Sequence, residues 1–168
     1  MINWAYFPKN AEIDAVSKSV VEIFQCKENE ISSSKFTYES NKVLAIVSEK
    51  LTDKGFAVEK SKKKSEKINV PVLFGINGKS QLSFDADAYR KDVGYVIEVE
   101  AGRAVTNYQF LKDFFEASMM MGIEYLCIAV RNKYRSHKDF ELVNKFFDAM
   151  YASRRLGIPL KGLLIIGY

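Results

Sequence analysis

The spacing of apolar side chains along the chain predicts an alternation of helices and strands. In four segments apolar residues recur three or four positions apart, which is the period of a helix with one buried face. Glycines at the ends of the last three segments are typical helix stops, and Asn10 is the expected N-cap of the first. The predicted helices span residues 11–26, 35–55, 107–122 and 136–157.

Shorter runs rich in Val, Ile, Phe and Tyr predict strands between and after these helices. The predicted strands cover residues 56–61, 68–78, 79–92, 93–102, 123–130 and 160–168. Asn77-Gly78 is the dipeptide that best tolerates the positive φ angles of a tight turn, so the second and third strands are expected to form a hairpin. The late β-α-β-α-β alternation favours a mixed sheet with helices on both faces.

Length and composition limit the class of protein. With 168 residues, 48% of them hydrophobic and 27% charged, the chain fits a single globular domain without an internal repeat. No apolar run is long enough to cross a bilayer, and the first residues lack the segments of a signal peptide, so we predict a cytoplasmic protein without membrane contact. The net charge of +4 is mild, so a case for an anionic partner depends on where the charges lie.

Four carboxylates interrupt two of the predicted strands. Asp85 and Asp87 lie on one strand, and Glu98 and Glu100 lie on the next. Side chains alternate between the faces of a strand, so each pair shares a face, and pairing of the strands would gather three or four carboxylates. Like charges at such distances cannot all stay ionised unless a cation lies among them. Two interpretations stay open: a Mg²⁺ or Mn²⁺ site, which we favour, and a solvent-facing surface paired with Lys and Arg.

The order of these acids along the predicted elements resembles the PD-(D/E)XK nuclease superfamily, the fold of many type II restriction endonucleases. The resemblance covers roughly residues 36–135: a helix bearing a glutamate, an acid on one strand, an acid-x-acid triplet on the next, then a helix and a strand. It implies an α/β, restriction-endonuclease-like fold with a mixed central sheet flanked by helices. The nuclease-like domain would occupy residues 1–168, with its core at about 36–168 and a helical extension at 1–30.

The resemblance also implies roles for individual residues. Asp87 matches the aspartate of the motif, Glu98 its second acid, and Glu100 the position usually held by lysine. Asp87 and Glu98 would hold Mg²⁺ or Mn²⁺, and Glu100 would bind a second ion or deprotonate the attacking water. Glu39 would be the auxiliary acid of the preceding helix. Asp85 is either a fourth acid at the edge of the site or a structural residue.

Further polar side chains are candidates for DNA contact. The run from residue 59 to residue 67 contains five lysines and no apolar residue, which is typical of an exposed, mobile connection. Its lysines either bind the DNA backbone or only form a solvated loop. Arg103 would contact phosphate or base edges, although an ion pair explains it equally well. The predicted DNA contacts are Lys62, Lys63, Lys64, Arg103, Asn107 and Gln109.

The function implied by the resemblance is hydrolysis of DNA phosphodiester bonds by a Mg²⁺-dependent endonuclease of the restriction type. Because one site per chain would have to cut both strands of a duplex, a two-fold homodimer is the expected assembly. Two alternatives stay open on the same fold. One is a repair or recombination nuclease that recognises DNA structure, and the other is a catalytically inactive module that binds DNA or a protein.

Overall fold

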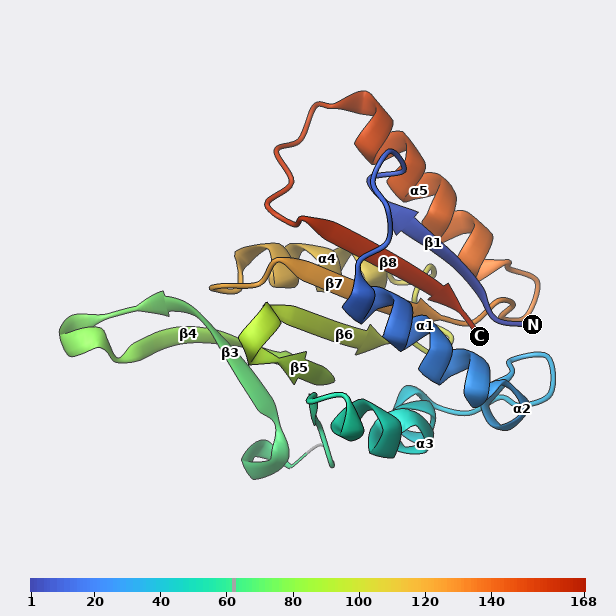
Figure 1. Ribbon diagram of the computed structural model, residues 1–168, viewed down its shortest axis with the longest axis horizontal. Helices are drawn as coiled ribbons and strands as arrows, with labels where there is room; N and C mark the ends of the chain where they lie inside the picture. The colour runs from blue at the N-terminus through green and yellow to red at the C-terminus, as the bar shows by residue number, and fades with distance from the viewer. Residues whose placement is uncertain (62) are drawn as a thin grey trace.

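A computed structural model of the chain shows an α/β fold built on one six-stranded mixed sheet (Figure 1). It describes residues 1–61 and 63–168. The strand order is β1-β8-β7-β6-β5-β2, in which β6, β7 and β8 run parallel and every other neighbouring pair is antiparallel. The strands are β1 (Asn3–Phe7), β2 (Ala57–Val58), β5 (Ala88–Arg90), β6 (Tyr95–Val99), β7 (Tyr125–Val130) and β8 (Gly162–Gly167).

Helices cover both faces of this sheet, as the sequence predicts (Figure 1). The alternation of side chains along β6 divides the core: Ile97 packs with residues of α1 to α3, and Val96 packs with residues of α4 and α5. The α-helices are α1 (Ala15–Cys26), α2 (Glu28–Ile31), α3 (Ser40–Asp53), α4 (Gln109–Met119) and α5 (Asp139–Ser153). Three single-turn 3₁₀ helices are η1 (Lys64–Glu66), η2 (Ile76–Gly78) and η3 (Lys91–Val93).

A hairpin of β3 (Ile68–Phe74) and β4 (Ser80–Ala86) forms a separate two-stranded sheet that projects from the body (Figure 1). Asn77 and Gly78 have φ angles of 59° and 70°, so the predicted turn is confirmed. The expectation of one continuous strand over 79–92 is wrong. The chain leaves the hairpin after Ala86 and enters the central sheet at Ala88, so the two halves of that segment pair with different partners.

The first residues contribute a strand that the sequence pattern does not predict. β1 pairs antiparallel with β8 at the edge of the central sheet, and Phe7 at its end is fully buried. The first helix begins at Ala15 rather than residue 11, because the carboxylate of Asp14, and not Asn10, caps it by accepting the Ser17 N–H at 2.8 Å. No helix in the described ranges is both long and apolar enough to cross a bilayer.

Candidate functional site

A cavity of about 640 Å³ opens at the carboxyl end of β6, between α3, α4 and the base of the β3–β4 hairpin. Two lysines, Lys67 and Lys112, are the basic side chains among the described residues that line it. Acidic side chains outnumber them. The carboxylates that line the cavity are Glu59, Asp85, Asp87, Glu98, Glu100, Asp113 and Glu116.

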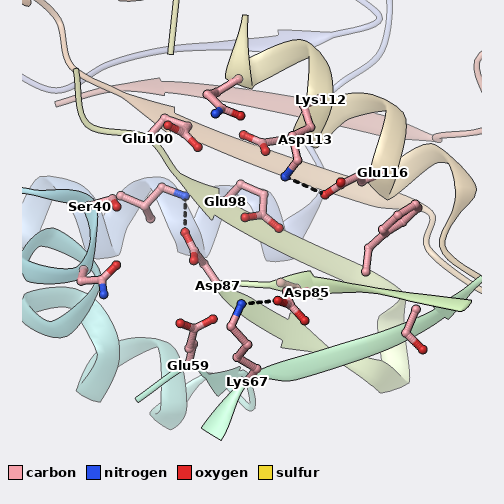
Figure 2. A pocket seen from close by; sticks show the side chains of 16 residues that line it. Ser40, Glu59, Lys67, Asp85, Asp87, Glu98, Glu100, Lys112, Asp113 and Glu116 are labelled. Atoms are coloured by element: carbon pink, nitrogen blue, oxygen red, sulfur yellow. Dashed lines mark hydrogen bonds and ion pairs between the residues drawn. The ribbon is translucent and has the colours of Figure 1, made fainter. Parts of the chain in front are cut away.

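Both lysines form ion pairs with acids at the rim of this cavity. Lys67 pairs with Asp85 (Figure 2). Asp85 also accepts a hydrogen bond from the side chain of Asn69 across the hairpin. Lys112 pairs with Glu116 one turn further along α4, at 3.2 Å (Figure 2). Asp85 therefore has structural partners of its own. None of Asp87, Glu98, Glu100 and Asp113 forms an ion pair with a lysine or arginine of the described residues.

Asp87 lies where the chain passes from the hairpin to the central sheet. Because Ala88 pairs with Ile97 in the register of β5 and β6, the carboxylate of Asp87 reaches the end of β6. There its Oδ2 accepts the backbone N–H of Val99 at 2.8 Å. The predicted pairing of the two acidic segments is thus confirmed, although a break between sheets separates Asp85 from Asp87.

Glu98 and Glu100 project to the same side, as strand alternation predicts. Their neighbours Ile97 and Val99 are buried against the core that contains α1 to α3, so the two glutamates face α4. Glu100 stands just past the end of β6, where its N–H donates to the carbonyl of Ala129 at 2.8 Å. Figure 2 shows both carboxylates in the same hollow as Asp87.

Asp113 on α4 is one of three acids of this cavity that the sequence interpretation missed, together with Glu59 and Glu116. Asp113 is only 5% exposed, and its Oδ2 has no hydrogen-bond partner in the described part of the chain. A signal exists in the sequence: a polar stripe at helical spacing follows one face of α4. That stripe consists of Gln109, Lys112, Asp113 and Glu116, and all four side chains line the cavity.

Burial and mutual repulsion disturb the ionisation of these acids. Burial, followed by the negative charge of Glu100, raises the pKa of Asp113 from 3.8 to about 8. Burial and then the charge of Asp87 raise the pKa of Glu100 to about 7. Burial also raises the pKa of Asp87 to about 6, partly offset by its bond to Val99, and raises that of Glu98 well above its ordinary value. The cluster of Asp87, Glu98, Glu100 and Asp113 is thus electrostatically destabilised without a cation.

The donor set of this acidic cluster fits a hard divalent cation. Every available ligand is a carboxylate oxygen, the type that Mg²⁺ and Mn²⁺ prefer. A bound cation would also give the Oδ2 atom of Asp113, which has no hydrogen-bond partner in the described residues, an interaction partner. Among residues 1–61 and 63–168, however, no three Asp, Glu, His or Cys side chains stand close enough to hold one ion as they are oriented. Binding would therefore require the carboxylates to turn toward one another.

The other residues singled out from the sequence lie in several places. Gln109 lines the acidic cavity, whereas Arg103 lines a separate hollow. Asn107 is exposed at the surface and lines neither of the two. Glu39 is the N-cap residue of α3, and it too lines the separate hollow rather than the acidic cavity. Lys63 is exposed. Lys62 and the side chain of Lys64 lie outside what the structure describes.

Comparisons with known proteins do not assign the chain to a family. No protein-family model matches it, and a search of curated proteins returns no match.

Proposed function

We propose that the protein is a metal-dependent deoxyribonuclease that hydrolyses DNA phosphodiester bonds, in the manner of a restriction-type endonuclease on a PD-(D/E)XK-like fold. One observation carries the proposal. Carboxylates from the start of β5, the end of β6 and the middle of α4 share one solvent-accessible cavity, and none of them forms an ion pair with a lysine or arginine of the described residues. A structural acidic surface would not need to gather Asp113 into a nearly buried position.

The residues of the cavity divide the chemical tasks. Asp87 and Glu98 would hold Mg²⁺ or Mn²⁺, which supplies Lewis acidity toward the scissile phosphate and a more acidic bound water. Glu100, half-buried at the cavity wall, accepts a proton from the attacking water. Glu100 occupies the position where the nuclease motif usually has a lysine, and a glutamate cannot stabilise negative charge on the phosphate. Lys112 on α4, which lines the same cavity, provides that positive charge instead.

Cleavage of supercoiled plasmid tests this proposal. Purified protein should nick or linearise the plasmid with Mg²⁺ or Mn²⁺, and EDTA should abolish the reaction. Asp87→Asn and Glu98→Gln should each lower the rate by about a hundredfold or more, since each removes a charged ligand. Glu22→Gln is the matched control, because Glu22 is exposed on α1, on the opposite face of the sheet.

The result that would overturn the proposal is equally specific. Folded protein that leaves plasmid, single-stranded and branched DNA intact with either metal ion is not a nuclease. Binding of DNA without cleavage would then support the alternative of a catalytically inactive DNA-binding module. Preferential cleavage of branched DNA would instead identify a repair or recombination nuclease.

A further inference from the structure

A second hollow of about 870 Å³, the basic pocket, lies beside the acidic cavity at the carboxyl ends of the parallel strands. The loop after β6 contributes Arg103, and the loop after β7 contributes three further cations. The α2–α3 connection adds serine and threonine hydroxyls. The basic side chains of this pocket are Arg103, Arg131, Lys133 and Arg135.

In the described part of the chain, the basic side chains that line this pocket outnumber the carboxylates. Glu39 is the one carboxylate among the described residues that line it. None of the four basic side chains forms an ion pair with a carboxylate of residues 1–61 or 63–168. Four cations that converge on a pocket lined by one carboxylate leave an excess of positive charge, which raises the local potential and favours an anionic ligand.

Arg131, which lines the basic pocket, carries a buried donor that the described residues do not satisfy. Its side chain is buried, at 6% exposed, and one terminal nitrogen donates to the carbonyl of Tyr38. Its charge also acts on Asp139 and on the hydroxyl of Tyr168, but its Nε–H has no partner in the described residues. A buried guanidinium N–H without an acceptor is costly, and a ligand oxygen would satisfy it if the side chain turned toward the pocket.

The ring of Tyr134 contacts two of the arginines. The guanidinium carbons of Arg131 and Arg135 lie 5.0 and 5.2 Å from the centre of its ring, within the range of cation–π attraction. Reciprocal backbone hydrogen bonds of 2.9 Å between Tyr134 and His137 close the loop that carries them. Side chains ordered in advance lose less entropy when they bind a ligand.

Gly102, in the loop after β6, packs against the loop after β7 that carries Tyr134. Its φ angle is +88°, and a Cβ there would lie 2.7 Å from the ring of Tyr134. Only glycine allows the two loops to approach so closely. The loop after β6 therefore keeps Arg103 against the same pocket wall as Tyr134 and its two arginines.

The basic pocket and the acidic cavity adjoin at two points of the chain. Glu39 lines the pocket while Ser40 lines the cavity, and Ala101 lines the pocket while Glu100 lines the cavity. The hydroxyl of Tyr168 donates to the carbonyl of Glu100 at 2.9 Å and also interacts with Arg131. A ligand that spans both hollows would thus meet negative charge at one end and positive charge at the other.

We propose that the basic pocket binds a phosphate group of a nucleic acid strand, at a position beside the phosphodiester bond that enters the acidic cavity. The planar guanidinium groups match phosphate oxygens, and the hydroxyls add neutral donors. Phosphate binding follows from the pocket alone. The position next to the reacting bond rests on the proposed nuclease function.

Fluorescence anisotropy with short oligonucleotides in EDTA tests binding separately from cleavage. Three single-stranded probes of one sequence carry a 5′-phosphate, a 3′-phosphate or no terminal phosphate. Arg135→Gln and Lys133→Gln, which alter exposed side chains, should each weaken binding about tenfold and lower the salt slope by about 0.7. Arg131→Met should weaken it further. Arg155→Gln removes an equally exposed arginine beyond α5 and should leave the affinity unchanged.

Each outcome bears on the inference. A loss confined to one terminally phosphorylated probe identifies a terminal phosphate as the ligand, and an equal loss for all three identifies an internal phosphate. Inorganic phosphate should compete with the probes for wild type and much less for Arg135→Gln. If the Arg135 and Lys133 variants bind every probe as wild type does, the basic pocket is not a phosphate site, even if the protein cleaves plasmid. If these variants lose binding and the protein cleaves nothing, the phosphate site stands and the nuclease function fails.

Discussion

Asp113 carries a carboxylate on the buried side of α4, where it lies between apolar residues of the core and the acids of the cavity. Phe110 and Phe114, its neighbours on the helix, are buried on the apolar stripe. An acid in such a place stays ionised at neutral pH only with a cation beside it. Its environment therefore makes the stability of the metal-free protein depend on pH.

The first prediction concerns the sign of that dependence. Folding raises the pKa of Asp113 from 3.8 to about 8, so between these values the folded state binds the proton more tightly than the unfolded chain. Asp113 therefore stabilises the fold at low pH, and this contribution is lost as the pH rises, with the loss complete above about 8. Urea unfolding in EDTA should show the free energy of unfolding of wild type falling relative to Asp113→Asn across this window. A constant difference would mean that Asp113 is not held in the repulsive cluster.

The second prediction concerns Asp87 and the metal ion. Asp87→Asn nearly conserves shape and can still accept the Val99 N–H, but it removes one repelling charge. In EDTA at neutral pH the variant should be more stable than wild type by on the order of 1 kcal/mol, allowing for the partial exposure of the carboxylate. Mg²⁺ at about one hundred times its Kd should add about 2.7 kcal/mol to wild type and much less to the variant.

Asp85→Asn is the matched control for this measurement. Asp85 lies two positions away and lines the same cavity, but its ion pair with Lys67 is lost in the variant. This substitution should not raise the melting temperature. If both variants gain stability equally, or if Mg²⁺ stabilises wild type and Asp87→Asn alike, then Asp87 is not repelled by the other acids of the cavity.

At the scale of single elements, the start of β6 depends on close backbone contact with the start of β7. Gly94 accepts the N–H groups of Glu124 and Tyr125 at 2.8 and 3.0 Å. Its φ angle is +64°, and a Cβ at this position would lie 2.2 Å from the carbonyl oxygen of Gly122. The strand that carries Glu98 is positioned by this contact.

The third prediction separates backbone strain from steric conflict at that contact. Gly122 also has a positive φ angle, +74°, but a Cβ there would meet nothing within 4 Å. Gly122→Ala should therefore cost about 1 kcal/mol of stability from strain alone, and Gly94→Ala about 3 kcal/mol because a clash adds to it. Chemical denaturation of both variants measures the difference. Equal losses would show that the neighbouring backbone moves aside without cost.

Sequence patterns identify elements well where local and tertiary preferences agree. The strands β7 and β8 are continuous apolar runs, and both lie buried in the middle of the sheet. β1 could not be predicted in this way, because its five residues show no clear alternation and the strand exists through its pairing with β8. The break at Asp87 arises because the two halves of residues 79–92 join different sheets, and that pairing is decided by tertiary contacts rather than by local sequence.

The candidate site was only partly accessible to the same patterns. Strand alternation brings Glu98 and Glu100 to one face without further information. Asp113 lies on a helix far along the chain, so its approach to them depends on how α4 packs. The basic pocket assembles from three loops, and loop conformation has no periodic signal in sequence.

At the scale of the whole molecule, opposite charges occupy neighbouring hollows although the net charge is only +4. A polyanion such as DNA is repelled by the acidic cavity unless cations nearby compensate. The basic pocket is one source of compensation. The lysine run between β2 and β3 is the second source that the sequence suggests.

The fourth prediction tests that lysine run. Replacement of Lys62, Lys63 and Lys64 by Ala should weaken DNA binding and flatten its dependence on salt concentration, because fewer counterions are released. Cleavage at saturating DNA should change little, since no residue of the acidic cavity is altered. Titrations at several salt concentrations give the slope. A slope identical to that of wild type would show that the run is only solvated surface.

The break at Asp87 joins two mechanically distinct parts of the molecule. On one side the β3–β4 hairpin projects into solvent, and on the other β5 is fixed within the sheet (Figure 1). The backbone of Asp87 is clamped there, because its carbonyl accepts the Glu59 N–H at 2.8 Å while its side chain holds Val99. The hairpin is also tied to the body at β3, where the carbonyl of Pro71 accepts the Met121 N–H at 2.8 Å. A force applied to the hairpin by a long substrate therefore reaches Asp85 on β4 and then Asp87, before it reaches Glu98, Glu100 or Asp113.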